Sequence, residues 1–304
     1  MSELENENID DDWKIALRSE IIKSLTGAAD GKDESYAKVG EYYYCSAPAS
    51  LYKYYNDNPR NLENIKNNKM WFSAPCNFND VFDCDIPIDS KKIFDSALKM
   101  APFNVKPGSN MWRDLKAEVN KGIKTLSKVL VNLKKTTGVS CFSESYDSLL
   151  MWAHYANNHR GLCVEYDLMD INKEIGFSAI PVVYSKDRTY LNSLENLENE
   201  GYILEIFINS LISKSPEWKY EKEWRIVRDD ASCGNRWDCE NNGALLDMIT
   251  PSSIILGCEV QCDFQRQVED YCKSNKINLY KMEKDEELYK LNKKCLLEFN
   301  DDSN

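Results

Sequence analysis

The chain has 304 residues, of which 38 are Lys or Arg and 50 are Asp or Glu, so its formal net charge is −12. This excess of negative charge argues against a protein that coats nucleic acid through phosphate contacts, although it is compatible with a local basic groove. No apolar run reaches the roughly 18–20 residues that a membrane span needs. Residues 1–8 are acidic and polar, unlike a signal peptide. We therefore expect a cytoplasmic protein with no membrane partner.

The N-terminal part differs in composition from the rest of the chain. We predict that residues 1–41 form an acidic extension with one amphipathic helix near Asp12–Leu25, followed by a small and polar linker over Thr26–Gly40. A folded core domain is expected over residues 42–304. The length of the chain suits one large domain or two ordinary ones, and the sequence leaves the oligomeric state open.

Strands and helices are mixed along the core without strict alternation. Asn58 followed by Pro59 is typical of a helix start. Strands are predicted at Leu51–Tyr55, Met70–Ser73, Gly138–Ser143, Leu162–Tyr166, Ile180–Tyr184 (paired with the preceding strand), Lys219–Arg228, Ser253–Gly257, Ile277–Met282 and Leu288–Phe299. Helices are predicted from Pro59 and over Ser90–Met100, Asn110–Lys135, Ser148–Asn158, Leu191–Leu211 and Asp263–Ser274. The order predicts an α+β protein with a single mixed or antiparallel β core flanked by helices.

The segment Trp218–Val227 carries the most informative local pattern. In a strand, alternation would place Tyr220, Trp224 and Ile226 on one face. Glu221, Glu223 and Arg225 would then share the other face. Two carboxylates beside an arginine are suited to general acid–base work or to an anionic ligand. The alternative is an exposed strand face with a cross-strand ion pair.

Three further groups of residues are candidates for binding. Both histidines, His154 and His159, fall on one predicted helix about 140° apart, which suits a shared metal poorly. The loop Asn77–Asp83 offers Asn79, Asp80 and Asp83, which could accept from ribose hydroxyls or bind a hard cation, or could simply hold a tight loop. Eleven cysteines without a CxxC pair favour reduced thiols, so we expect no metal.

The helix over Asn110–Lys135 places Lys121, Lys124 and Lys128 on one face. A charge run of this kind is more often a solvated helix surface than a nucleic-acid patch, and we favour the former here.

Five ordered motifs resemble a widespread family of uncharacterised bacterial proteins that often lie near mobile and phage-defence genes. The motifs are Leu51–Tyr55, Trp71–Asp83, Ser140–Glu144, Leu150–Gly161 and Trp218–Arg225. The resemblance spans about Leu51 to Gly257. It implies an architecture more than an activity, with a toxin or effector in anti-phage defence as the expected setting.

A more distant resemblance is to the ADP-ribosyltransferase fold, which also opens with an aromatic strand, a short helix and an apolar strand. In that fold a first-strand His or Arg contacts the ribose of NAD, and this chain has Lys53 there. The resemblance implies that Tyr155 is the aromatic beside nicotinamide and that Glu221 or Glu223 is the catalytic glutamate.

These resemblances suggest an enzyme that cleaves the N-glycosidic bond of NAD or a related nucleotide. Glu223 would stabilise the oxocarbenium-like sugar, and Glu221 would orient the acceptor or act as base. Lys53 and Arg225 would hold the diphosphate. The aromatic side chains of Tyr54, Trp71 and Tyr155 would stack on a ring of the cofactor. The polar side chains of Asn79, Asp80 and His154 would also contact the cofactor.

Two other functions stay open at this point. A non-catalytic sensor would use its charged loops to bind a phage or host protein. A metal-dependent nuclease would gather Asp80, Asp83 and Glu223 around Mg²⁺. For the enzyme, the acceptor could be a protein or a nucleic acid.

Overall fold

The computed structural model describes residues 12–26, 29–176, 179–193, 200–229 and 233–299. Its helices are α1 (Asp12–Thr26), α2 (Ala29–Cys45), α3 (Pro59–Lys66), α4 (Ser90–Met100), α5 (Asn110–Thr136), α6 (Leu149–Tyr155), α7 (Leu168–Ile175), α8 (Glu200–Leu211) and α10 (Cys262–Asn275). Short 3₁₀ helices are η1 (Pro75–Asn77), η2 (Pro216–Glu221) and η3 (Gly234–Arg236). No helix among the described residues is both long and apolar enough to cross a membrane.

The strands are β1 (Ser50–Tyr55), β2 (Lys69–Ser73), β3 (Thr137–Ser143), β4 (Leu162–Asp167), β5 (Ala179–Pro181), β6 (Val183–Tyr184), β7 (Ser213–Lys214), β8 (Glu223–Asp229), β9 (Trp237–Asp238), β10 (Gly243–Asp247), β11 (Ser253–Leu256), β12 (Asn278–Lys284) and β13 (Leu291–Leu297). Most of them form one mixed sheet in the order β13-β12-β11-β4-β1-β3-β2-β10-β9. The prediction of an α+β protein with a mixed β core flanked by helices is confirmed.

The sheet forks at β3. This strand pairs with β8 along its whole length, from Thr137 opposite Asp229 to Ser143 opposite Glu223. On its other side β3 shares only one residue pair with β1 and one with β2. Because β1 leaves β3 after a single pair, the side chains of β1, β3 and β8 can border a common hollow at the fork.

The two faces of the sheet bury separate apolar clusters, as alternation along each strand requires. Leu162 and Val164 of β4 face the larger cluster, which α1, α2, α7 and α10 cover. Cys163 faces the opposite way, into a smaller cluster with Tyr54 and Trp152 under α6. Helices α1, α2, α7 and α10 therefore pack on one face of the sheet, and α6 packs on the other.

The predicted linker over residues 26–40 is wrong, because α2 occupies that stretch from Ala29 onward. Helix α1 packs on the main cluster through Leu17, which is fully buried, and Trp13 contacts Trp224 of β8. Lys14 also forms an ion pair of 2.5 Å with Glu144 at the end of β3. The polar composition of residues 26–40 did not indicate a helix, because this helix is stabilised by tertiary packing of its buried face.

Several predicted elements are confirmed and others change. Helix α4 has the predicted bounds, and Asn58 caps α3 by accepting from the backbone N–H of Arg60. The predicted strand over Ile180–Tyr184 does not pair with β4. It divides instead into β5, which pairs with β8, and β6, which pairs with β7. Helix α8 begins at Glu200, and the predicted helical residues 194–199 lie outside the described ranges.

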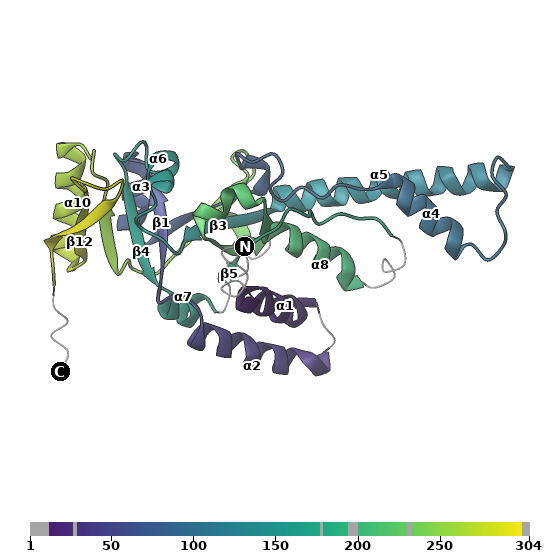
Figure 1. The fold of residues 1–304 in the computed structure, drawn as a ribbon, viewed down its shortest axis with the longest axis horizontal. Coiled ribbons are helices and arrows are strands. Elements are labelled where there is room, and N and C mark those ends of the chain that lie inside the picture. Colours follow the sequence, from purple (N-terminus) through teal and green to yellow (C-terminus); the bar gives the residue numbers. More distant parts are fainter. Residues whose placement is uncertain (1–11, 27–28, 177–178, 194–199, 230–232, 300–304) are drawn as a thin grey trace.

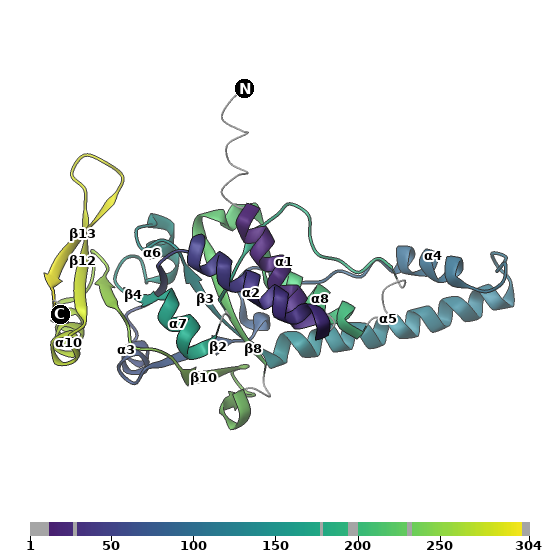
Figure 2. The ribbon, with the colours of Figure 1, turned by 90° about the horizontal axis from the view of Figure 1, so that it is seen from below.

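Helices α4 and α5 form an arm that projects from the body of the molecule (Figures 1 and 2). The two helices are joined through the loop at residues 101–109 and project beyond the sheet. Ile93 of α4 packs with Val119 and Ile123 of α5 and with α8 residues in a separate apolar cluster.

Gly161 gives a direct test of the packing at the start of β4. Positive φ falls on the preceding residues Asn157, Asn158 and His159 and not on Gly161. A Cβ at Gly161 would lie 2.0 Å from the backbone oxygen of Tyr55. Glycine is therefore needed for the close approach of β1 and β4.

We predict that Gly161→Ala lowers the free energy of unfolding in urea by about 1–3 kcal/mol, the usual cost of overpacking. Gly122→Ala is the control, because Gly122 lies inside α5 and a Cβ added there would have no atom within 4 Å. That substitution should raise the free energy of unfolding by about 0.5–1 kcal/mol. Equal effects of the two substitutions would contradict the close-approach argument.

Candidate functional site

A cavity of about 180 Å³ opens at the fork of the sheet. Its walls come from β1, the loop after β2, β3, α6 and the η2–β8 segment, which are far apart in the sequence. The lining residues are Tyr52, Lys53, Tyr54, Phe78, Asn79, Asp83, Cys141, Phe142, Met151, Tyr155, Lys214, Glu221, Glu223 and Arg225. Seven residues predicted as catalytic or cofactor-binding line this cavity, namely Glu221, Glu223, Lys53, Arg225, Tyr54, Tyr155 and Asn79.

Arg225 is the centre of the charged wall. It is fully buried, and its guanidinium forms a two-bonded ion pair with Asp83 at 2.9 and 2.7 Å. Two more bonds of 2.8 and 3.0 Å reach Glu223, and the remaining N–H donates to the backbone oxygen of Leu211 at 2.7 Å. A guanidinium has five N–H donors, so all of them are used. Arg225 therefore orders the carboxylates and has no donor left for the diphosphate predicted from the sequence.

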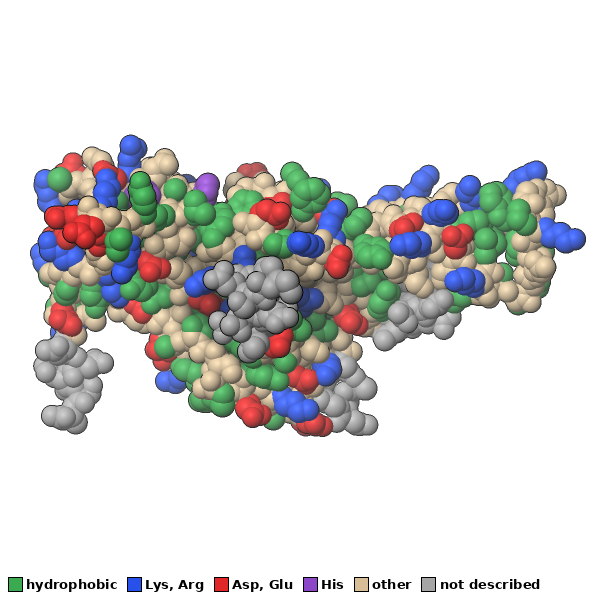
Figure 3. Space-filling view, viewed as in Figure 1, with side chains coloured by type: hydrophobic (Ala, Val, Ile, Leu, Met, Phe, Trp, Pro, Cys, Tyr) green, Lys and Arg blue, Asp and Glu red, His purple; other side chains and the backbone are tan. Residues whose placement is uncertain are grey.

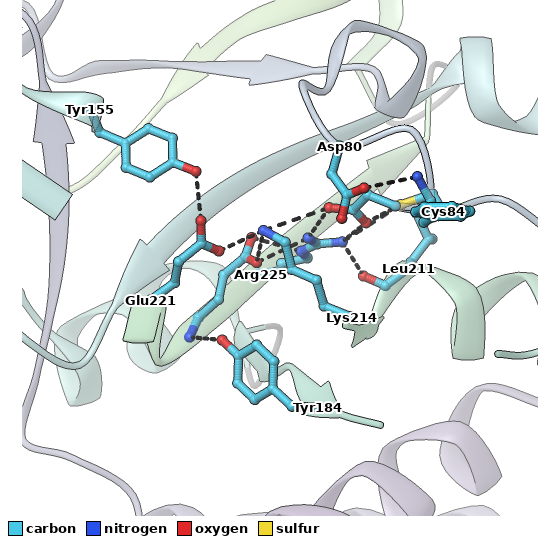
Figure 4. Close-up of polar contacts among 11 residues, drawn as sticks. Asp80, Cys84, Tyr155, Tyr184, Leu211, Lys214, Glu221 and Arg225 are labelled. Carbon is cyan, nitrogen blue, oxygen red and sulfur yellow. Dashed lines mark hydrogen bonds and ion pairs between the residues drawn. The ribbon is translucent and has the colours of Figure 1, made fainter. Parts of the chain in front are cut away.

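Lys214 links the three carboxylates and was not foreseen. Its ammonium lies 2.5 Å from Glu221, 3.1 Å from Glu223 and 3.8 Å from Asp83 (Figure 4). Lys214 follows α8 in a segment without any motif, so no local pattern pointed to it. The indirect sign was the number of carboxylates: three buried carboxylates need a second cation besides Arg225, because an unpaired buried charge is costly.

The two glutamates do not lie on one continuous strand as predicted. Glu221 ends η2, Lys222 adopts a left-handed conformation with φ 45°, and Glu223 begins β8. The chain turns between them, and this turn lets both carboxylates reach the same lysine. Trp224 and Ile226 do share the apolar face of β8, as alternation predicted, whereas Tyr220 lies in η2.

The two carboxylates differ in their protonation behaviour. Burial alone would raise the pKa of Glu223, but the charges of Arg225 and Lys214 outweigh burial and hold that pKa below its usual range. Burial and the nearby charge of Glu223 raise the pKa of Glu221, and the contacts with Lys214 and Tyr155 offset only part of this rise. Paired titratable groups with pKa values pushed apart are typical of acid–base sites.

Glu221 and Glu223 are both buried, but the carboxylate of Glu221 has fewer hydrogen-bond donors around it. The Tyr155 hydroxyl donates to Glu221 Oε1 at 2.6 Å, and Lys214 donates to Oε2. Glu223 instead accepts from Arg225 twice, from Lys214, and from the thiol of Cys141. A carboxylate has about four acceptor positions, so those of Glu223 are filled while Glu221 has room for another donor.

Lys53 and the aromatic rings form the opposite wall. The Lys53 ammonium donates to the backbone oxygen of Cys141 at 2.9 Å and lies 5.2 Å from the centre of the Phe142 ring. Burial lowers the pKa of Lys53, while the charge of Glu223 partly restores it. The described residues give Lys53 no carboxylate within ion-pair distance, so it is a cation available to a ligand.

The remaining predicted residues divide between the cavity and its surroundings. Tyr54 and Tyr155 line the cavity, and Asn79 contacts the Tyr155 hydroxyl. Asp80 does not line it, because its carboxylate accepts from the backbone N–H of Phe82 at 2.9 Å and holds the loop. His154 is exposed and stacks loosely near Tyr220.

One other sequence-based expectation changes, because Trp71 lies against Gly243 of β10 and takes no part in the cavity. His159 also lies outside the cavity, and burial lowers its pKa. Within the described ranges, no group of three or more His, Cys, Asp or Glu side chains is arranged to hold a metal ion.

A second cavity of about 180 Å³ shares Lys214 with the first. Its walls carry the hydroxyls of Ser185, Ser213 and Ser215, the cations of Lys186 and Arg188, and the carboxylates of Asp85 and Asp187. Arg188 forms an ion pair of 2.5 Å with Asp85, so Lys186 and the hydroxyls are the donors that suit phosphate or ribose oxygens.

Comparison with known proteins gives one match. Residues 151–226 match a family model described as a protein of unknown function, DUF2971. The match contains α6 from Met151 onward, β4, Lys214 and both glutamates, so it covers much of the site. No curated protein and no solved structure matches the chain. The prediction that part of the chain resembles an uncharacterised family is therefore supported over these residues.

We predict that Asp83→Ala lowers the free energy of unfolding by about 3–5 kcal/mol, because it leaves the buried guanidinium of Arg225 without its main partner. Asp247→Ala is the control, since Asp247 pairs with Lys69 and Arg236 on the exposed surface. Pairs of that kind contribute about 0–1 kcal/mol. Urea unfolding followed by circular dichroism measures both, and similar losses would show that Arg225 does not depend on Asp83.

Proposed function

We propose that the protein cleaves the N-glycosidic bond of NAD or a closely related nucleotide. The observation that carries the proposal is the pair Glu221 and Glu223, whose pKa values shift in opposite directions at one aromatic-walled cavity. The distant resemblance to the ADP-ribosyltransferase fold supports the same chemistry. Transfer to a protein or nucleic-acid acceptor and hydrolysis by water both remain part of the proposal.

The composition of the cavity suits a cationic ring. The three carboxylates of Asp83, Glu221 and Glu223 are matched by three cations, on Arg225, Lys214 and Lys53, so neither charge is in excess. The nicotinamide ring of NAD is a cation, which is attracted to the faces of aromatic side chains. Tyr54, Phe142 and Tyr155 supply those faces.

The size of the cavity indicates how a dinucleotide would lie. A volume of about 180 Å³ is below the roughly 300 Å³ at which pockets for whole drug-sized ligands begin. The cavity suits one ring and its sugar. The diphosphate would then lie toward Lys53 and the adjoining cavity, where Lys186 and Arg188 are found.

In the proposed reaction the bond between C1′ of the ribose and N1 of nicotinamide breaks, and the electron pair stays on N1. Nicotinamide leaves as a neutral molecule, and the sugar becomes oxocarbenium-like. An acceptor oxygen attacks C1′, and its proton passes to Glu221, the carboxylate with a free acceptor position. Glu223 acts as a fixed negative charge close to the sugar, and Tyr155 positions Glu221 through their hydrogen bond.

The other two sequence-based hypotheses fare differently. The nuclease hypothesis required Asp80, Asp83 and Glu223 around one metal, yet Asp80 lies outside the cavity and Arg225 occupies the other two. The sensor hypothesis needs ligand binding without turnover, and the same experiments address it. A role as a toxin or anti-phage effector stays a prediction based on the resemblance.

We predict that the protein releases nicotinamide from NAD, measured by chromatography, and that Glu221→Gln lowers kcat/KM at least a hundredfold, which is typical for loss of a general base. Glu144→Gln is the control. Glu144 is half-buried and directly follows β3, but it pairs with Lys14 and Trp224 outside the cavity. Wild-type protein that is thermally stabilised by NAD but releases no nicotinamide would identify a sensor instead.

The pH dependence should identify the working carboxylate. Since the pKa of Glu221 is raised, this residue is protonated and inactive as a base at pH values where an ordinary glutamate is already ionised. We expect the acidic limb of the kcat/KM profile to lie above the ordinary glutamate pKa of 4.5. The residual activity of Glu221→Gln should lack this limb, and an unchanged limb would assign the base to another group.

Lys53 is predicted to act in binding rather than in the chemical step. Lys53→Met keeps the apolar stem and removes the charge, so KM for NAD should rise about tenfold or more, as expected for loss of a charge-assisted hydrogen bond. Lys14→Met removes a lysine that already pairs with Glu144 and should leave KM unchanged. A KM unaltered by Lys53→Met would remove Lys53 from the ligand site.

A further inference from the structure

The arm carries a charge opposite to that of the rest of the chain. Residues 89–136, which contain α4 and α5, hold eleven Lys or Arg and four Asp or Glu, a net charge of +7. The other residues therefore carry a net charge of −19, since the whole chain has −12. Lys and Arg side chains can be followed along the arm in the space-filling view (Figure 3).

Within the arm, five cations line up on α5. Successive residues of a helix turn by about 100°, so Arg113, Lys121, Lys124, Lys128 and Lys135 fall within an arc of about 80°. With a rise of about 1.5 Å per residue the row is about 33 Å long. All five side chains are exposed. We call this row the basic stripe.

The basic stripe faces away from the protein core. The apolar side of α5, with Val119, Ile123 and Leu126, packs against α4 and α8. Among the described residues, the one carboxylate within ion-pair distance of the stripe is Glu118, at 3.9 Å from Lys121. Most of the positive charge of the stripe is therefore not neutralised within the chain.

We propose that the basic stripe binds the phosphate backbone of duplex nucleic acid. A row of about 33 Å matches one turn of a duplex, which is about 34 Å long and carries one phosphate charge per about 1.7 Å. The charge of −19 on the remainder repels phosphate, so contact is confined to the arm.

The composition of the stripe favours nucleic acid over an acidic protein. Four of its five members are lysines, and lysine is depleted in the centres of protein–protein interfaces. Lysine also presents a compact charge rather than the planar fork with which arginine reads guanine. The stripe should therefore bind duplexes without regard to sequence, and its affinity should fall steeply with salt.

The test measures binding of labelled 30-base-pair DNA and RNA duplexes to the full-length protein by fluorescence anisotropy between 50 and 200 mM salt. The test variant is Lys121→Gln/Lys124→Gln/Lys128→Gln. The control is Lys66→Gln/Lys173→Gln/Lys273→Gln, which removes the same charge from exposed lysines of α3, α7 and α10. Gln and Lys have similar helix propensities, so both variants should keep their helices.

For wild-type protein we expect binding to at least one duplex at 50 mM salt. The test variant should bind at least tenfold more weakly, and the slope of log K against log salt should fall by about 2–3 if each lysine contacts one phosphate. The control should match wild type. The proposal is overturned if neither duplex binds, if the two variants lose affinity equally, or if poly-glutamate or phosphatidylserine vesicles bind more tightly than the duplexes.

This inference is independent of the proposed function. The basic stripe shares no residue with the cavity at the fork, so the test variant should release nicotinamide from NAD at the wild-type rate. Loss of duplex binding with turnover retained would support the stripe alone, and absence of turnover would leave the duplex measurement unaffected.

Discussion

The burial of Arg225 is the constraint on which the site depends. A guanidinium without solvent must have all five donors satisfied, and here Asp83, Glu223 and the backbone of Leu211 satisfy them. These partners come from the loop after β2, from the start of β8 and from the end of α8. One side chain therefore fixes three separate segments around the fork of the sheet and determines where the cavity forms.

The burial of Arg225 also divides the side chains of the site into structural groups and groups that are free to contact a ligand. Arg225, Asp83 and Glu223 satisfy one another, so they give rigidity and a fixed electrostatic field. Glu221 and Lys53 are left with unused hydrogen-bonding capacity, and burial shifts the pKa of each toward its neutral form. Keeping such groups in a partly buried cavity costs stability, which is typical of sites selected for binding or catalysis.

The arm is positively charged and the rest of the molecule is negatively charged, a difference that the net charge of the whole chain does not show. From the sequence we favoured a solvated surface for Lys121, Lys124 and Lys128, because a charge run on a helix is more often solvated than bound to nucleic acid. The structure changes that interpretation, because α5 projects beyond the sheet and carries the row from Arg113 to Lys135 away from the acidic body (Figure 2). Local fields act over about a Debye length of 10 Å, so the arm presents its own charge to a partner.

The sequence by itself determined the elements whose signals are local: Asn58 and Pro59 at the start of α3, the bounds of α4, and the apolar face of β8. It also selected Glu221, Glu223, Lys53 and Tyr155, which do meet at one cavity. Only the tertiary structure decided that residues 29–45 are helical, that Arg225 has no free donor, and that Lys214 joins the carboxylates. The reason is that burial and charge pairing depend on residues distant in the chain, and short-range periodicity carries no information about them.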